Sequence, residues 1–207
     1  VDEEASADVY VVNSCTVTGV GDKKSRQMLR HFRRKNPNAV IALTGCYAQA
    51  FPEQASALME ADVVTGTADR AQLLPAVLDA LDGKRVVHVS PHSEDEGFEP
   101  MQADGMLDRT RAFVKIEDGC DNSCSYCIIP KARGHVRSKP LRDLERELES
   151  LVSRGYNEVV LSGINLPFYG RDLGISLVDA VELACDIVPR VRLSSLEPEL
   201  LKREDVE

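Results

Sequence analysis

Three cysteines lie close together in the middle of the chain, in the stretch GCDNSCSYCIIP: Cys120, Cys124 and Cys127. Three residues and then two residues separate them, and no fourth cysteine is nearby. Thiolates are the usual ligands of iron-sulfur clusters, and three thiolates can hold three irons of a cubane cluster while the fourth iron stays open. An open iron is a place for chemistry, so this loop is the first candidate for a reactive site.

Zinc and disulfide bonds are the alternative explanations of this loop. A structural zinc ion needs four ligands, and the nearest fourth ligand, His135, follows Cys127 by eight residues, which is not a standard finger spacing. Disulfides are a weaker explanation, because the chain has six cysteines in 207 residues and no apolar signal segment. Unligated thiols in one tight loop would also be prone to oxidation. A metal cluster explains the loop best, with zinc as the alternative.

Composition sets the outer limits. The chain is 43% hydrophobic and 29% charged, as in an ordinary globular protein, and it has no apolar run long enough to span a bilayer. Its net charge of -9 gives no global attraction to nucleic acid, so any such contact must be local. We expect a cytoplasmic monomer without membrane association. The chain lacks an initiating methionine and stops in the charged run LLKREDVE, so we expect a piece of a longer protein.

Short Val- and Ile-rich runs alternate with amphipathic segments in residues 1–90. This alternation predicts a doubly wound parallel sheet. The expected strands are 8–13, 39–45, 61–66 and 84–89, and the expected helices are 19–36, 52–60 and 68–83. Residues 91–108 are polar and acidic without apolar period, which indicates a linker.

A second pattern of strands and helices fills residues 109–207. The expected order is strand 111–118, the cysteine loop, helix 141–154, strand 157–163, helix 176–188 and strand 190–195. This order predicts the first half of a β/α barrel, with the cysteine loop after the first strand, where such folds carry their active sites. Leucines 141, 144, 148 and 151 share one helix face, and Cys185 is predicted to be a core thiol.

Cys15 and Cys46 each follow a predicted strand of the first domain directly. Carboxyl ends of parallel strands meet at one sheet edge, so both thiols are expected there. Either cysteine alone is more simply a small buried residue, whereas the pair in equivalent turns favours a shared ligand site. Two thiolates are too few for a cluster, so we expect a third from elsewhere.

The cysteine loop, with Tyr126 just before its third cysteine, resembles the signature of radical S-adenosylmethionine (radical SAM) enzymes. The stretches NSCTVT, DKKSRQ, TGCYAQ, GCDNSCSYCIIPKARGHVRS, LSGINLPFYG and RLSSLEP are similar to those of the methylthiotransferases that modify tRNA. The similarity covers essentially the whole chain. It implies a first domain for an auxiliary cluster and a radical SAM barrel that is incomplete here.

The resemblance implies two 4Fe-4S clusters and S-adenosylmethionine as cofactors. Cys120, Cys124 and Cys127 match the ligands of the radical cluster, and Cys15 and Cys46 match the second and third auxiliary ligands. The first auxiliary ligand, the rest of the barrel and the RNA-binding domain have no match, so we expect the chain alone not to be a complete enzyme. The implied partners are tRNA and a reducing electron donor such as flavodoxin or ferredoxin. In the implied reaction one cofactor molecule donates a methyl group and a second yields the radical that abstracts hydrogen.

Further site residues are expected near the loop and at strand ends. The basic residues at 131, 133, 135, 137 and 139 alternate and would share one face of an extended segment. Arg133 and Arg137 are therefore candidates for substrate phosphate, with a salt-bridged strand as the alternative. The family's Gly-Gly-Glu run after the second barrel strand is absent, and Ser-Gly-Ile-Asn stands there instead. Gly163 and Asn165, with Ser195, Glu197 and Tyr126, are the candidates for cofactor contact.

The residues of these motifs most resemble those of the branch that acts on N6-threonylcarbamoyladenosine next to the tRNA anticodon. Relatives of that branch act on isopentenyladenosine in tRNA or on an aspartate of a ribosomal protein. A non-catalytic iron-sulfur or zinc protein is the alternative from a different class.

Overall fold

A computed structural model describes residues 6–16, 18–99 and 110–197 of the chain. The chain divides into two compact units. The amino-terminal unit consists of Val1–Ser93 and Asn122–Gly134, and the carboxyl-terminal unit of Glu94–Asp121 and His135–Glu207. The segment that carries Cys124 and Cys127 is thus grouped with the amino-terminal unit, and we describe each unit by itself.

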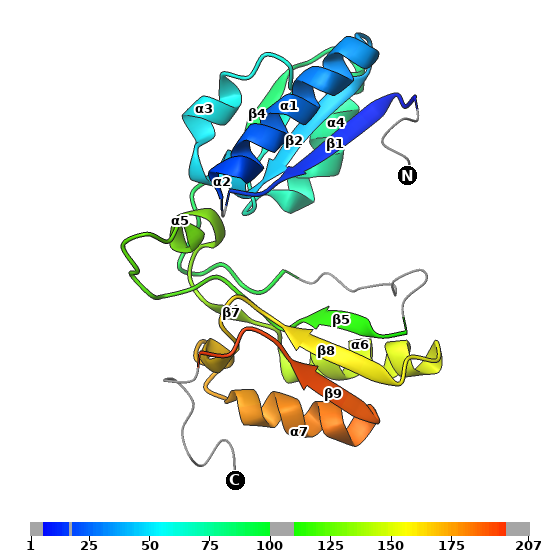
Figure 1. Ribbon diagram of the computed structural model, residues 1–207, viewed down its shortest axis with the longest axis vertical. Helices are drawn as coiled ribbons and strands as arrows, with labels where there is room; N and C mark the ends of the chain where they lie inside the picture. The colour runs from blue at the N-terminus through cyan, green and yellow to red at the C-terminus, as the bar shows by residue number, and fades with distance from the viewer. Residues whose placement is uncertain (1–5, 17, 100–109, 198–207) are drawn as a thin grey trace. The chain divides into compact units, whose positions relative to one another are not determined.

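The amino-terminal unit is built on a four-stranded parallel sheet with the order β1-β2-β3-β4 (Figure 1). Its strands are β1 (Val9–Ser14), β2 (Val40–Gly45), β3 (Val63–Thr65) and β4 (Val86–His88). Every residue of β2 is buried, as the continuous apolar run predicts for a strand that is covered on both faces.

Helices cover both faces of this sheet. They are α1 (Gly19–Lys35), α2 (Cys46–Ala50), α3 (Pro52–Ser56) and α4 (Leu73–Leu81), the last preceded by a 3-10 turn, Arg70–Gln72. Leu29 and Phe32 of α1 pack with Ile41 of β2 on one face, whereas α4 packs with Val40 on the other. Neighbouring strand residues point to opposite faces, so these contacts confirm the predicted doubly wound arrangement.

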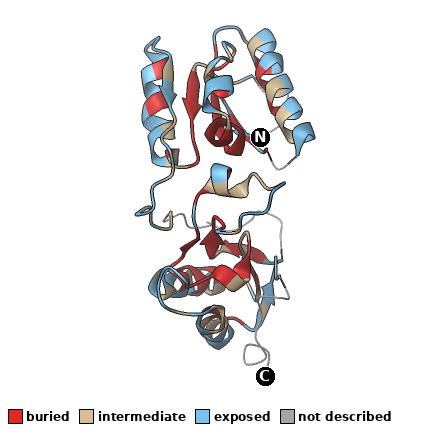
Figure 2. Ribbon diagram, turned by 90° about the vertical axis from the view of Figure 1, so that its left-hand side faces the viewer, coloured by how far each residue is buried: buried red, intermediate tan, exposed pale blue. Residues whose placement is uncertain are grey.

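The carboxyl-terminal unit contains a parallel sheet in the order β5-β8-β9. Its elements are β5 (Ala112–Lys115), α6 (Leu141–Ser153), β8 (Glu158–Ser162), the 3-10 turn η2 (Leu166–Phe168), α7 (Leu177–Ile187) and β9 (Arg190–Leu193). The predicted leucine stripe of α6 packs into one core with Val114, Leu161 and Ala184. Figure 2 shows this core as buried sheet and helix faces. A sheet covered by helices on one face is the wall expected of a partial β/α barrel.

Three expectations from the sequence were wrong in detail. The strand predicted at 111–118 breaks at Ile116, because this residue's N–H bonds Ser162 and its C=O accepts from Lys139. Beyond the break, β6 (Glu117–Asp118) pairs antiparallel with β7 (Arg137–Ser138). Cys185 is exposed rather than a core thiol, because Ala180 and Ala184 form the buried stripe of α7 and Cys185 is turned away from it.

The third expectation that was wrong is the extended basic segment at 131–139. Its first part is helical, since α5 spans Ile129–Arg133. Pro130 in the first turn favours a helix start, and Gly134, with φ of 73°, ends it. Lys131 and Arg133 therefore do not share a strand face with Arg137.

Residues 91–99 contain neither helix nor strand, and residues 100–108 of the expected linker lie outside the described residues. Glu94–Glu99 group with the carboxyl-terminal unit, where the Phe98 ring lies under the ammonium groups of Lys115 and Lys139 at 5.2 and 5.5 Å. In the described part of the chain, no helix combines the length and the apolar character that crossing a membrane requires.

Candidate functional site

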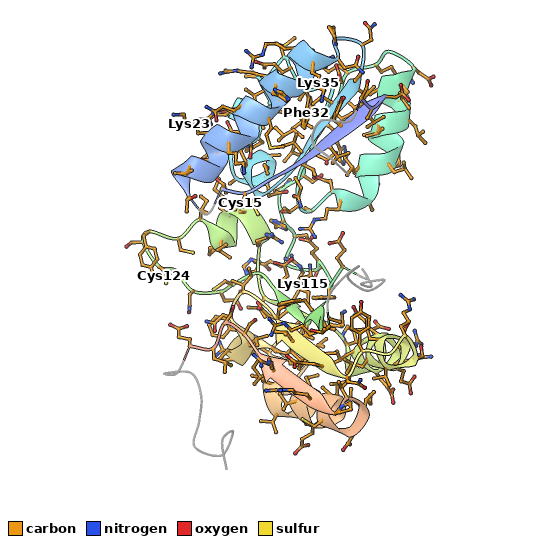
Figure 3. All side chains as sticks on the ribbon, turned by 45° about the vertical axis from the view of Figure 1, so that its right-hand side comes forward. Cys15, Lys23, Phe32, Lys35, Lys115 and Cys124 are labelled. Atoms are coloured by element: carbon orange, nitrogen blue, oxygen red, sulfur yellow. The ribbon has the colours of Figure 1, made fainter. Side chains whose placement is uncertain are left out.

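Cys15 and Cys46 lie at the same edge of the amino-terminal sheet. They directly follow Ser14 and Gly45, which are paired in the register of β1 and β2. Cys15 is exposed, and Figure 3 shows it beyond the end of β1. Cys46 begins α2 and is only 4% exposed. The two thiols thus stand at adjacent strand ends, where the sequence predicted them.

Local hydrogen bonds fix these strand ends. The Ser14 hydroxyl donates to the carbonyl of Thr44 at 2.6 Å and accepts from the N–H of Tyr47 at 3.1 Å. Gly45 has φ of 95°, and a Cβ atom there would lie 2.5 Å from the Ser14 carbonyl oxygen. Only glycine allows the two chain segments to approach so closely. This turn holds Cys46 against the end of β1.

The segment after Cys127 packs beside Cys46 within the same unit. Ala132 of α5 is fully buried in a small cluster with Cys46 and Ala50. The Thr67 hydroxyl donates to the carbonyl of Ala132 at 2.6 Å. Arg133 donates from Nε to the Sγ atom of Cys46 at 3.0 Å. The guanidinium that the sequence singled out for substrate therefore contacts a candidate cluster ligand.

The loop of Cys120, Cys124 and Cys127 crosses the boundary between the two units. Cys120 is buried, Cys124 is exposed and Cys127 is half-buried, and no disulfide joins any of the six cysteines. The Cys127 N–H bonds the Cys124 carbonyl at 3.0 Å in a tight turn, and Tyr126 is 90% exposed. The described residues gather no group of three metal-binding side chains. The donor set fits an iron-sulfur cluster in its chemistry, because it offers three reduced thiols at the right spacing.

Several expected cofactor residues gather at the carboxyl edge of the carboxyl-terminal sheet. Gly163 and Asn165 follow β8, and Ser195 and Glu197 follow β9. The Asn165 side-chain amide donates to Glu197 at 2.7 Å, and the Leu166 N–H bonds the Ser195 carbonyl at 3.2 Å. Ser195 has φ of 52°, the one non-glycine residue with positive φ among those described. Strained backbone of this kind concentrates at functional sites.

Glu117 is a candidate site residue that the sequence analysis did not identify. Its side chain is completely buried, and its Oε2 atom accepts from the N–H groups of Ile164 at 2.6 Å and Asn165 at 2.9 Å. Burial raises the pKa of Glu117 to about 7, although the two backbone N–H groups oppose that shift. The sequence did contain a signal for this residue: a carboxylate at the carboxyl end of a barrel strand, a position where active-site residues are often found.

Arg137 lies inside the carboxyl-terminal unit. It is only 8% exposed, its Nη1 atom donates to the His135 carbonyl at 3.1 Å, and the same atom lies 3.8 Å from Glu96. These contacts favour the alternative reading of a paired strand residue over contact with phosphate.

Comparisons with known proteins show which family the chain resembles in sequence and fold. Residues 1–66 match the model of uncharacterized protein family UPF0004, and residues 114–205 match the Radical SAM superfamily. The chain is 40% identical to threonylcarbamoyladenosine tRNA methylthiotransferase MtaB of Bacillus subtilis, over 100% of the chain and 47% of that protein. The chain belongs to the radical SAM methylthiotransferase family. It is also 40% identical to MtaB of Thermotoga maritima, over 98% of the chain and 46% of the relative.

A relative from another branch is more distant. The chain is 33% identical to tRNA-2-methylthio-N(6)-dimethylallyladenosine synthase of Dictyoglomus thermophilum, over 90% of the chain and 43% of that protein. The chain thus spans about half the length of the curated relatives it matches.

Solved structures show a similar fold. The radical S-adenosylmethionine methyltransferase TsrM of Kitasatospora setae, solved with cobalamin and a [4Fe-4S] cluster, has a TM-score of 0.55 at 15% identity. The similarity covers 88% of this chain and 41% of that one. At this identity it supports the partial radical SAM fold and nothing about ligands.

Proposed function

We propose that this chain is the cluster-binding part of a tRNA methylthiotransferase that modifies N6-threonylcarbamoyladenosine next to the anticodon. The observation that carries the proposal is the 40% identity to the two MtaB relatives over nearly the whole chain. The dimethylallyladenosine relative is 33% identical, which favours the threonylcarbamoyladenosine branch. The proposed partners are tRNA and a reducing electron donor of the flavodoxin or ferredoxin type.

The proposed cofactors are S-adenosylmethionine and two 4Fe-4S clusters. Cys120, Cys124 and Cys127 would hold the radical cluster, and Cys15 and Cys46 would supply two ligands of an auxiliary cluster. When bound, the reduced radical cluster and S-adenosylmethionine together supply the radical chemistry that activates a substrate C–H bond, and the cofactor also supplies the methyl group.

The chain's own residues bind and orient these groups. The turn at Gly45 and the Ser14 hydroxyl hold Cys46 at the sheet edge beside the position of Cys15. Arg133 donates from Nε to the Cys46 sulfur and would help to orient this ligand. In the other unit, Gly163, Asn165, Ser195 and Glu197 form the edge proposed for cofactor contact. Tyr126 is proposed to cover the cofactor from the exposed side of the loop.

Anaerobic reconstitution of the chain tests the cluster chemistry. Iron and sulfide are measured, and the electron paramagnetic resonance (EPR) spectrum of the reduced cluster is recorded with and without S-adenosylmethionine. A change in the spectrum is expected if one iron is open to the cofactor. Zinc in place of iron, with no spectral response, would instead favour a structural metal protein.

Nucleoside analysis tests the substrate. In a strain that lacks the full-length gene, mass spectrometry of digested tRNA should show N6-threonylcarbamoyladenosine without its methylthio form. Loss of the methylthio form of isopentenyladenosine would assign the enzyme to the other tRNA branch. If all tRNA nucleosides are unchanged, tRNA is not the substrate.

A further inference from the structure

Glu117 combines complete burial with contacts that reach across the carboxyl-terminal sheet. It begins β6, directly beyond the break that ends β5, and the loop that it contacts follows the neighbouring strand β8. Burying a carboxylate is costly unless hydrogen bonds compensate. The hydrogen bonds that Glu117 makes therefore indicate its structural role.

Glu117 contacts the loop of residues 163–165. One carboxylate oxygen, Oε2, accepts both the Ile164 and the Asn165 N–H, at 2.6 and 2.9 Å. A Cβ atom on Gly163 would lie 2.4 Å from the same oxygen. The carboxylate thus occupies the space that a side chain at 163 would need. Glycine at 163 and glutamate at 117 form one interlocking contact.

Two buried oxygen atoms beside this contact remain without a hydrogen-bond partner among the described residues. They are Oε1 of Glu117 and Oδ1 of Asn165. Asn165 is 7% exposed, and its amide nitrogen is already used by Glu197. Buried acceptors are nearly always satisfied in native proteins, so a donor from a ligand or from an ordered water molecule would complete the hydrogen bonding at both atoms.

We propose that Glu117 is a positioning residue that holds the loop 163–165 in the conformation in which Asn165 can meet S-adenosylmethionine. This inference rests on the proposed function and deepens it, because it names a residue that would position the cofactor-contacting loop. Glu117 acts through the backbone of Ile164 and Asn165. A glutamine at 117 can accept the same two N–H bonds through its amide oxygen, whereas a leucine cannot.

Hydrogen exchange tests the contact without any cofactor. Amide exchange at Ile164 and Asn165 is compared in the wild-type chain, Glu117→Gln and Glu117→Leu. Loss of both bonds in Glu117→Leu should speed exchange at these two amides by roughly 10-fold or more, and Glu117→Gln should stay near wild type. Val114→Ala is the matched control, because Val114 is fully buried in the same unit and lies outside this hydrogen-bond set. It should lower stability without singling out these amides.

Cofactor response tests the consequence. In the iron-reconstituted protein, the S-adenosylmethionine concentration that gives half of the EPR change should rise by roughly 10-fold in Glu117→Leu but not in Glu117→Gln or Val114→Ala. Gly163→Ala displaces the carboxylate from the other side and should reproduce the Glu117→Leu result, which keeps the test available if the leucine variant does not fold.

The outcomes separate the two proposals. If the wild-type cluster does not respond to S-adenosylmethionine, the proposed function fails, whatever the exchange shows. If it responds, and Glu117→Leu responds at the same concentration, the proposed role of Glu117 is overturned while the proposed function stands. Equal exchange of the Ile164 and Asn165 amides in the wild type and the leucine variant would also overturn it.

Discussion

The guanidinium of Arg133 donates from Nε to the sulfur of Cys46 at 3.0 Å. These residues are 87 positions apart in the sequence, and both belong to the amino-terminal unit. The contact places the end of α5, which follows Cys127, on a candidate cluster ligand.

Removing this contact should expose Cys46. In the cluster-free chain, Cys46 is buried whereas Cys15 is exposed, so Cys46 should be alkylated much more slowly. Arg133→Gln loosens α5 from α2, and the alkylation of Cys46 should then become several-fold faster because local opening becomes easier. Peptide mass spectrometry measures the rates, with Cys15 as the internal reference. An unchanged ratio of the two rates would show that Arg133 does not hold this packing.

The pKa of Glu117 predicts a pH dependence of stability. Its pKa is about 7 in the folded chain, against an ordinary value of 4.5, because its carboxyl is buried. The folded state therefore binds more protons than the unfolded state between these pH values. The free energy of unfolding should fall as pH rises from about 4.5 past 7, by about 3 kcal/mol from this group. Urea denaturation across this range measures the effect.

Glu117→Gln is the control for that prediction. The amide does not titrate, so its denaturation curves should lose this component of the pH dependence while the rest is kept. A glutamine variant with the same pH profile as the wild type would assign the dependence to other groups.

Gly163→Ala should destabilise the carboxyl-terminal unit. The new Cβ atom would meet the Glu117 carboxylate at 2.4 Å and Leu166 at 3.0 Å. Overpacking of this kind costs about 1–3 kcal/mol. Thermal or urea unfolding measures the loss. Gly97→Ala in the same unit is the matched control, because nothing lies within 4 Å of a Cβ atom there. Equal effects of the two substitutions would contradict the proposed crowding.

The ion pair of Lys139 and Glu147 is buried, with side chains only 4% and 3% exposed. Breaking one partner leaves an uncompensated buried charge, so Lys139→Met or Glu147→Met alone should each cost about 3–5 kcal/mol. Replacing both residues by methionine should restore most of that loss. A double-mutant cycle by urea denaturation tests this, and additive single losses would show that the two groups do not act as a pair.

The sequence alone predicted the fold class and most of its elements. Val- and Ile-rich runs predicted the strands, and the spacing of Leu144, Leu148 and Leu151 predicted the face of α6 that is buried. These features depend on the spacing of apolar residues within one strand or helix, which can be read from the sequence directly. Cys15 and Cys46 could be placed at one edge because parallel strands share the direction in which they end.

One prediction failed because local helix signals outweighed the alternating pattern, and another failed because tertiary contacts competed with it. Alternating basic residues suggested an extended segment at 131–139, but Pro130 and Gly134 delimit a helix there. The run at 111–118 breaks at Ile116, because its backbone groups bond Ser162 and Lys139 from distant segments.

The motifs by themselves indicated the family and the residues that could ligate clusters, because the type and spacing of the ligands are properties of the sequence. Only the tertiary structure decided that Arg133 lies on Cys46 and that Glu117 holds the loop of Gly163 and Asn165. Those contacts join segments that are far apart in sequence, and long-range packing selects them. No short stretch of residues encodes such a contact.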